Sequence, residues 1–332
     1  MKIAINGMGR IGRAALKVIL ENKELELVAV NDIIDIENVA YLLNYDTVYG
    51  NYEHKVTHTN TSLEINGKTI PFYSERNPEE LPWEEYKVDL VIESTGVFTG
   101  YEDAERHIKA GAKTVIISAP TKSVEAPTVV HGVNTKAGHT SVFSCASCTT
   151  NNISPIVEIL GRRFGVKKAI ITTVHAYTAS QTAVDGPNKK NFRMGRAGAA
   201  NIIPTTTGAA IATTKALPEY EGKFDGVAIR VPIPVGSLSD MTFVMEKNVT
   251  VQEVNEILQE EAKTDRYKDV IDTTYDPIVS SDIVKSPFAS TVDLSMTRVV
   301  DGDLLKVMTW YDNEWGFTNQ MVRQIIDIKN NK

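Results

Sequence analysis

Three glycines near the start of the chain constrain its fold most strongly. Gly7, Gly9 and Gly12 lie between an apolar, strand-like segment (2–6) and an amphipathic, helix-like segment (13–20). In this context glycines permit a tight turn and let a pyrophosphate approach the N-terminus of the helix. A glycine pattern alone is weak, but its position between a strand and a helix predicts a dinucleotide-binding βαβ unit.

The residues that follow indicate which dinucleotide binds. A second apolar strand (25–30) ends at Asn31 and Asp32. A carboxylate about 20 residues beyond the glycines hydrogen-bonds a ribose hydroxyl and repels a 2′-phosphate. We therefore expect NAD as cofactor. A preference for NADP is the alternative, which the relative KM values for the two cofactors would decide.

The rest of the first half continues the alternation of strands and helices, which predicts an α/β, doubly wound, mostly parallel sheet. The expected elements are strands at 88–93, 113–118, 128–133 and 141–144 and a helix at 101–110. Asn66-Gly67 predicts a hairpin in an antiparallel edge or insertion over 51–82. Ser94, Thr95, Gly96 and Ser118 follow strands, where open α/β sheets bind their ligands.

Composition excludes several classes of protein. The chain has 332 residues, enough for two domains, with 42% hydrophobic and 23% charged residues. Its net charge of −7 and lack of a Lys/Arg block disfavour nucleic acid as main partner. The first residues show no signal-peptide character, and no segment has a membrane-spanning composition. We expect a cytoplasmic protein without a bound metal, and two cysteines do not form a disulfide framework.

Both cysteines lie in one short stretch, 144–152. Cys148 is expected at the junction of a strand and a helix, where free backbone N–H groups stabilise a thiolate. A nucleophilic Cys148 is the leading hypothesis. Cys145 and Cys148 also form a C-x-x-C pattern, typical of dithiol redox proteins. A narrower alternative makes Cys145 a resolving thiol for an oxidised Cys148.

A nucleophilic thiol needs a base, and His175 ends a strand-like segment, 167–175. We interpret His175 as that base, which would also lower the pKa of the thiol. A satisfied structural histidine is the simpler reading. The other histidines fit a base less well: His54, His58, His107 and His139 are expected in exposed polar stretches, and His131 in a short strand.

Two features downstream suggest anion binding. Residues 204–208 precede a helix of small residues (209–217), and hydroxyl and N–H groups at a helix start can hold an anion. Arg230 lies among apolar residues of a strand (224–231), where a guanidinium suits a phosphate or an internal salt bridge. The long connection 179–203 is expected to be functional.

The second half predicts an α+β catalytic domain with a largely antiparallel sheet. Its remaining elements are strands at 239–246, 290–294, 297–300 and 304–310 and helices at 251–262 and 317–328. We expect an NAD-binding domain over 1–147, completed by the C-terminal helix within 313–332, and a catalytic domain over 148–312.

Several long motifs in one order resemble the family of phosphorylating glyceraldehyde-3-phosphate dehydrogenases over essentially the full chain. The matching segments are 5–13, 147–151, 175–178, 203–210, 230–232 and 310–314. The resemblance implies that Cys148 attacks the aldehyde to form a hemithioacetal, with His175 as base. Hydride then passes to NAD, and inorganic phosphate cleaves the resulting thioester to 1,3-bisphosphoglycerate.

The resemblance also implies binding roles and a homotetramer with loop 179–203 at a subunit interface. Thr178 and Arg230 would hold the substrate's phosphate, and Ser147, Thr149, Thr207 and Gly208 the inorganic phosphate. NAD would be bound by Gly7, Gly9, Arg10, Ile11, Gly12, Asp32, Arg76, Ser94, Thr95, Gly96, Ser118 and Asn313.

Some positions depart from the family pattern. Many members have asparagine at Cys145 and a second cysteine at Asn152. Met194 replaces an arginine of many bacterial members, and Phe317 replaces a tyrosine. Erythrose-4-phosphate dehydrogenase, on the same scaffold, is the nearest alternative, and Thr178 favours glyceraldehyde 3-phosphate over it. A catalytically idle NAD-binding, adhesion or RNA-binding protein with the same fold is the alternative from another class.

Overall fold

The computed structural model describes residues 1–189 and 191–331; Lys190 in the loop 179–203 and the C-terminal Lys332 lie outside the described residues. The chain divides into two compact units. The first contains residues 1–129, 135–146 and 321–332, and the second contains residues 130–134 and 147–320. None of the described helices is both long and apolar enough to cross a bilayer.

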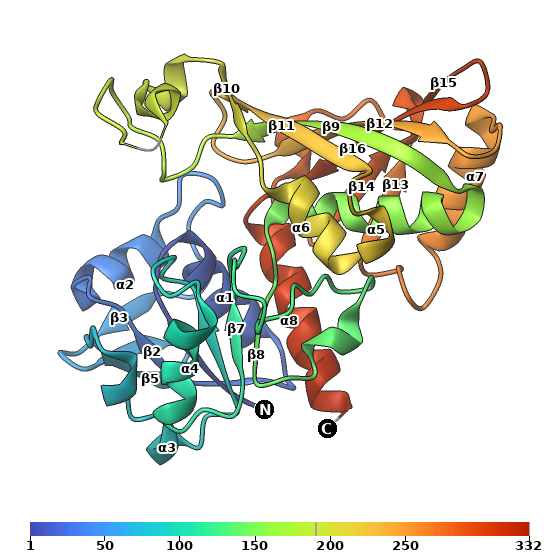
Figure 1. Ribbon diagram of the computed structural model, residues 1–332. Coiled ribbons are helices and arrows are strands. Elements are labelled where there is room, and N and C mark those ends of the chain that lie inside the picture. Colours follow the sequence, from blue (N-terminus) through green and yellow to red (C-terminus); the bar gives the residue numbers. More distant parts are fainter. Residues whose placement is uncertain (190, 332) are drawn as a thin grey trace. The chain divides into compact units, whose positions relative to one another are not determined.

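The first unit is an α/β layer structure around one sheet (Figure 1). Its strands are β1 (Lys2–Asn6), β2 (Glu26–Asn31), β3 (Val56–His58), β4 (Ser62–Ile65), β5 (Lys68–Tyr73), β6 (Leu90–Glu93), β7 (Val115–Ile117) and β8 (Val142–Ser144). Its helices are α1 (Arg10–Glu21), α2 (Ile36–Asn44), α3 (Trp83–Tyr86) and α4 (Tyr101–Lys109). The end of α8 (Trp315–Asn330) also belongs to this unit.

The strand order is β3-β4-β5-β2-β1-β6-β7-β8. The neighbouring strands β5, β2, β1, β6, β7 and β8 of this order all pair in parallel. The order reverses at β1, with β2 on one side and β6 on the other. Loops after β1 and β6 therefore meet at the carboxyl edge, the usual ligand site of such sheets. The predicted doubly wound sheet is confirmed, as is the hairpin at Asn66-Gly67, which joins β4 to β5.

The expected strand at 128–133 is wrong. Only Thr128 forms an isolated bridge, to Ser144. Gly132 has φ +79°, and Val133 N–H donates to the Val130 carbonyl, so the segment turns. His131 therefore lies in a turn, because left-handed backbone at glycine ends the extended run.

His107 is fully buried on α4, contrary to the expectation of an exposed histidine. Trp83 Nε1 donates to His107 Nδ1 at 2.9 Å, which places the ring proton on Nε2, 3.2 Å from the Glu93 carboxylate. Asn6 also donates to Glu93, at 2.6 Å. Helical spacing puts His107 on the same face as the buried Ala104, and its two polar partners satisfy it there.

The second unit has a largely antiparallel sheet. Its strands are β9 (Val166–Ala176), β10 (Ile203–Thr206), β11 (Phe224–Val231), β12 (Ser237–Met245), β13 (Ile271–Thr274), β14 (Ser290–Asp293), β15 (Arg298–Val300) and β16 (Leu304–Tyr311). Its helices are α5 (Cys148–Phe164), α6 (Ala209–Ala216) and α7 (Val251–Glu261). The sequence did not identify α2, β10 or β13.

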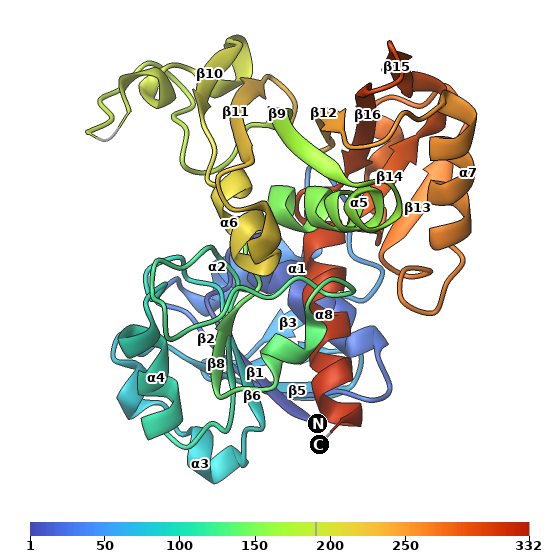
Figure 2. The same ribbon diagram turned by 45° about the vertical axis from the view of Figure 1, so that its right-hand side comes forward.

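The strand order of this sheet is β10-β11-β9-β12-β16-β14-β13, with β15 against β16. β9–β11 and β13–β14 are parallel pairs, and the other pairs are antiparallel, which confirms the expected α+β architecture. Figures 1 and 2 show α5 and α6 together beside the sheet. Apolar side chains of α5, α7 and the sheet form the core; they include Ile156, Leu160, Met241, Leu258 and Val307.

Candidate active site and dinucleotide pocket

The glycines of the first unit build the turn that the sequence predicts. Gly7 has φ +99°, and a Cβ there would lie 2.6 Å from Thr95 N. A Cβ on Gly12 would lie 1.9 Å from Gly7 O. A Cβ on Gly9 would meet no atom within 4 Å. Gly7 and Gly12 thus close the turn, whereas Gly9 leaves the space in which a pyrophosphate fits.

A pocket of about 400 Å³ opens at this turn and lies wholly in the first unit. Predicted cofactor residues that line it are Gly7, Gly9, Asp32, Arg76, Ser94 and Thr95. The Asp32 carboxylate accepts hydrogen bonds from Met8 N and Ile34 N, which holds it at the end of β2. The glycine cradle, the N-terminus of α1 and this carboxylate fit a dinucleotide.

The other predicted cofactor residues do not line this pocket. Arg10 and Ile11 begin α1, and Arg10 forms an ion pair with Asp46. Gly96 has φ +72° in the loop after β6. Ser118 follows β7, and its N–H donates to Glu93 O. Asn313 belongs to the second unit, where its side chain accepts from Gly236 N and Ser237 Oγ.

Alanine at Gly12 is expected to weaken NAD binding by about 100-fold or more and to lower stability, because its Cβ overlaps the Gly7 carbonyl. Alanine at Gly9 is expected to leave the melting temperature unchanged, since φ −67° suits alanine and the space is open. Alanine at Gly9 should nevertheless lower the affinity for NAD by about 10-fold, because its methyl group would contact the pyrophosphate. NAD titration with thermal unfolding measures both, and normal NAD affinity in Gly9→Ala would contradict the proposed pyrophosphate position.

In the second unit, Cys148 is the first residue of α5, and Ser147 is its N-cap. The Ser147 hydroxyl accepts from Thr150 N at 3.1 Å, which satisfies a free amide of the first turn. The next turn is anchored by Asn152, whose Oδ1 accepts from Thr309 Oγ1 on β16. The start of the helix is therefore held by local capping and by the sheet beneath it.

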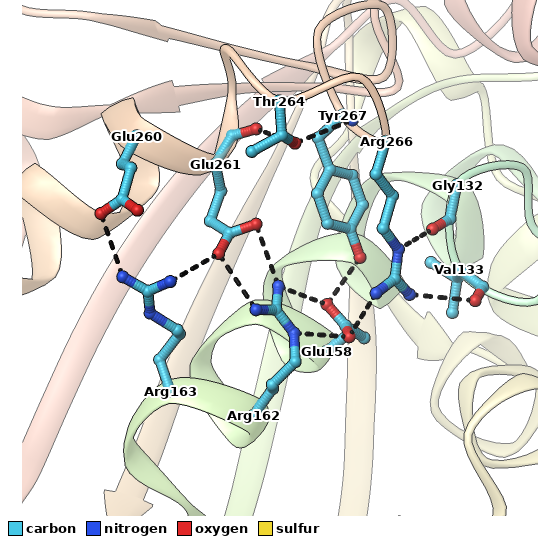
Figure 3. A network of polar contacts seen from close by, with 10 residues as sticks. All are labelled: Gly132, Val133, Glu158, Arg162, Arg163, Glu260, Glu261, Thr264, Arg266 and Tyr267. Carbon is cyan, nitrogen blue, oxygen red and sulfur yellow. Dashed lines mark hydrogen bonds and ion pairs between the residues drawn. The ribbon is translucent and has the colours of Figure 1, made fainter.

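Charged side chains hold the other end of α5 (Figure 3). The Glu158 carboxylate accepts from Tyr267 Oη at 2.6 Å and from Arg266 and Arg162. Arg162 and Arg163 also pair with Glu261 on α7. These contacts connect α5 to α7 and to the turn at 130–134, since Arg266 donates to backbone carbonyls there.

Cys148 Sγ lies 3.4 Å from His175 Nε2, so the structure brings the predicted nucleophile and base together. Arg230 on β11 is the register partner of His175 on β9. Its Nη1 lies 2.7 Å from His175 Nδ1 and donates to Ala176 O at 2.9 Å. His175 Nδ1 lies 2.7 Å from the same carbonyl. Thiol, imidazole and guanidinium thus form a continuous row.

The environment of the thiol differs from the sequence-based expectation. Removal of the sulfur from water raises the pKa of Cys148, although the charge of Arg230 and hydrogen bonds with Thr149 act in the opposite direction. Burial, and then the Arg230 charge, lowers the pKa of His175 to about 3. These shifts oppose the readily formed thiolate that the sequence predicts, because in this conformation burial favours a neutral thiol beside a neutral imidazole.

This pKa shift predicts a pH-dependent stability. The native pKa of about 3 lies below the ordinary value of 6.5, so below pH 6.5 the unfolded chain binds a proton at residue 175 that the native state excludes. Stability from this site is complete above pH 6.5 and falls as pH decreases toward 3. Between pH 7 and 4.5 the contribution of His175 to the free energy of unfolding falls by about 2–3 kcal/mol.

Urea unfolding of the parent and of His175→Asn at both pH values measures this effect. The contributions of all other titratable groups are common to both proteins and cancel in the comparison. Between pH 7 and 4.5 the free energy of unfolding should therefore fall by about 2–3 kcal/mol more in the parent than in the variant. Equal losses in the two proteins would show that the His175 pKa is not lowered by folding.

The predicted phosphate residues all lie in the second unit. Thr178 follows β9, with its hydroxyl 2.9 Å from Ser180 Oγ. Thr207 and Gly208 precede α6; Thr207 Oγ1 accepts from Ala209 N, and Gly208 is exposed. Thr149 is buried, and its hydroxyl lies 2.9 Å from Tyr311 Oη. Arg230 is half-buried, and its Nε has no hydrogen-bond partner among the described residues.

No role was predicted for Tyr311, although it lies in the segment 310–314 that resembles the family. Tyr311 Oη is 2.8 Å from Thr173 Oγ1 and 2.9 Å from Thr149 Oγ1. Its ring lies edge-on to His175, with centroids 6.0 Å apart. Burial raises the pKa of this phenol, so it remains neutral and connects α5 to β9 beneath the imidazole.

Cys145 lies in the first unit, and Cys148 lies in the second. Cys145 is 4% exposed, and burial raises the pKa of its thiol. Because the thiolate is the species that captures an oxidised sulfur, this environment disfavours the resolving role. Recovery of activity by dithiothreitol after peroxide, compared between the parent and Cys145→Ala, tests that role.

The fold and these residues define an NAD-dependent oxidoreductase. Residues 1–101 match the family model "Glyceraldehyde 3-phosphate dehydrogenase, NAD binding domain", and residues 147–313 match the C-terminal domain of that enzyme. The chain belongs to the glyceraldehyde-3-phosphate dehydrogenase family.

Curated relatives bearing that name cover nearly the whole chain. The protein of Thermotoga maritima is 49% identical over 97% of both chains. That of Streptomyces coelicolor is 47% identical over 99% of both, and that of Geobacillus stearothermophilus is 46% identical over 97% of this chain and 96% of its own. No relative described here favours erythrose-4-phosphate dehydrogenase.

Proposed function

We propose that this protein oxidises D-glyceraldehyde 3-phosphate to 1,3-bisphosphoglycerate with NAD and inorganic phosphate, as in glycolysis. The observation that carries the proposal is the row of Cys148, His175 and Arg230, with 3.4 Å between Sγ and Nε2 and 2.7 Å between Nη1 and Nδ1. A nucleophile, a base and a cation suited to a phosphate thus lie together in a family whose members carry this enzyme's name.

The reaction begins when Cys148 Sγ bonds to the aldehyde carbon and its proton passes through His175 to the carbonyl oxygen. His175 then takes the hydroxyl proton of the hemithioacetal as the carbon loses hydride, which leaves a thioester on Cys148. NAD, when bound, supplies the hydride acceptor. An oxygen of inorganic phosphate attacks the thioester carbon, and Sγ leaves as thiolate and regains the proton.

Two anion sites on the second unit serve this scheme. Arg230 and Thr178 would hold the phosphate of the substrate, because the Nε of the half-buried Arg230 is itself buried and has no partner among the described residues. Ser147, Thr149, Thr207 and Gly208 would form the site of inorganic phosphate at the starts of α5 and α6. The Ser147 and Thr149 hydroxyls already have protein partners, so their backbone N–H groups are the donors that we assign to phosphate.

NADH formation from glyceraldehyde 3-phosphate, with and without inorganic phosphate, tests the function. We expect sustained turnover only with phosphate, because the thioester otherwise accumulates. Erythrose 4-phosphate serves as the control substrate, and a higher kcat/KM on it would contradict the assignment. The ratio of KM values for NAD and NADP tests the role of Asp32.

We further propose a cytoplasmic homotetramer. Large apolar side chains of the loop 179–203 are exposed in the single chain: Val184 by 75%, Phe192 by 85% and Ile202 by 70%. Ile170 and Val227, on β9 and β11, are also exposed. Such surfaces are typical of interfaces between copies of a chain. Light scattering should give four times the chain mass of 36.6 kDa, and a monomer would contradict the assembly.

A further inference from the structure

Arg230 contacts the base as well as the expected position of the substrate's phosphate. Its Nη1 lies 2.7 Å from His175 Nδ1 and 2.9 Å from Ala176 O. Its Nε is buried and has no partner in the described part of the chain. The guanidinium is therefore incompletely satisfied where it stands, and an anion would offer it better hydrogen bonds.

This contact determines which nitrogen of His175 carries the proton. A guanidinium is always protonated and only donates, so Nδ1 must accept when Nη1 is beside it. A neutral imidazole then carries its proton on Nε2, the nitrogen 3.4 Å from Cys148 Sγ. An Nε2 that already holds a proton cannot take the proton of the thiol. The base is idle in this arrangement.

The other groups around His175 do not oppose this assignment. Cys148 faces it from α5, and the neutral Tyr311 faces it edge-on from β16. Among the described residues, the acceptor within hydrogen-bond distance of Nδ1 is Ala176 O, at 2.7 Å, and this carbonyl is the acceptor that a protonated Nδ1 needs. Both tautomers therefore have a prepared partner, and the position of Arg230 selects between them.

We propose that Arg230 holds His175 in the idle tautomer until the phosphate of the substrate draws the guanidinium away from Nδ1. This inference rests on the proposed function. When Arg230 turns to the phosphate, Nδ1 takes up a proton from solvent water and donates it in a hydrogen bond to Ala176 O, and Nε2 releases its own proton to solvent water, so one proton enters and one leaves. The imidazole stays neutral, and its Nε2 lone pair now faces the thiol. The phosphate of the substrate thus activates the base as well as increasing affinity.

The test uses an aldehyde that lacks the phosphate. D-Glyceraldehyde has no phosphate to draw Arg230 away, so Arg230 keeps its hydrogen bond to His175. The burst, which is the formation of the first NADH per active site, should therefore be slow in phosphate-free buffer. Phosphite, a phosphate-like dianion, should increase the rate of this burst when added separately. Measurement of the burst alone isolates the step that needs the base, because cleavage of the thioester is not required.

Arg230→Leu provides the opposite case. We expect its burst with glyceraldehyde, without phosphite, to be about 10-fold faster than that of the parent, the change that follows from removing one hydrogen bond from a charged donor. Added phosphite should have no effect on it. Its kcat/KM for glyceraldehyde 3-phosphate should fall, since the phosphate contact is lost. Arg298→Leu, at an exposed arginine of β15, is the matched control and should behave as the parent.

The outcomes separate the inference from the function on which it rests. An Arg230→Leu burst with glyceraldehyde no faster than the parent's, together with no effect of phosphite on the parent, would overturn the tautomer switch. If Arg230→Leu fails to fold, the response of the parent to phosphite decides alone. Absence of NADH formation from glyceraldehyde 3-phosphate in the parent would instead refute the proposed function.

Discussion

Replacement of Cys148 by serine is expected to lower NADH formation from glyceraldehyde 3-phosphate by about 10⁴-fold or more, in the range seen when a catalytic nucleophile is removed. A serine hydroxyl is a far weaker acid than a thiol, and a neutral imidazole beside it is too weak a base to compensate for this lower acidity. The initial burst of NADH at saturating NAD, followed by stopped flow, measures the loss.

Two controls accompany Cys148→Ser. NAD affinity should be unchanged, because the glycine pocket lies in the other compact unit. Cys145→Ala should retain most of the activity, since that buried thiol has no part in the proposed reaction. Phosphate-dependent NADH formation that survives Cys148→Ser would refute the covalent mechanism.

Replacement of His175 by asparagine is expected to lower the burst rate by about 10²–10⁴-fold at neutral pH, the usual contribution of a general base. Since burial raises the pKa of Cys148, the thiol of the variant remains protonated at pH 7. Its rate should therefore keep rising as pH increases and hydroxide removes the proton. The parent, whose base is neutral above pH about 3, should depend less steeply on pH.

Burst rates of the parent and of His175→Asn between pH 6 and 10 check this expectation. A variant with the same pH profile as the parent would show that His175 does not accept the thiol proton. Far-ultraviolet circular dichroism and NAD titration confirm that the variant is folded.

Several features could be predicted because their causes are local in the chain. The turn at Gly7, Gly9 and Gly12 follows from glycine's conformational freedom and from the strand and helix beside it. The start of α5 at Cys148 follows from the capping residue Ser147. The hairpin at Asn66-Gly67 follows from two adjacent residues that adopt positive φ.

Features that depend on distant residues were missed or misjudged. His107 was expected in an exposed stretch, yet Trp83 and Glu93 give it partners in the core. Tyr311 reaches Thr149 and Thr173 from more than 130 positions away in the chain. No spacing within the sequence reveals such pairs, because strand order is set by the packing of the whole sheet.

The sequence by itself determined the βαβ turn, the acidic end of β2, the thiol at a helix start and the family of the chain. Only the tertiary structure decided that thiol, imidazole and guanidinium lie in one row and that their protonation differs from the expected thiolate. The physical reason is that local hydrogen bonds and backbone conformations depend on neighbouring residues. The pKa of a side chain depends instead on how much water the fold removes and which charges it brings close.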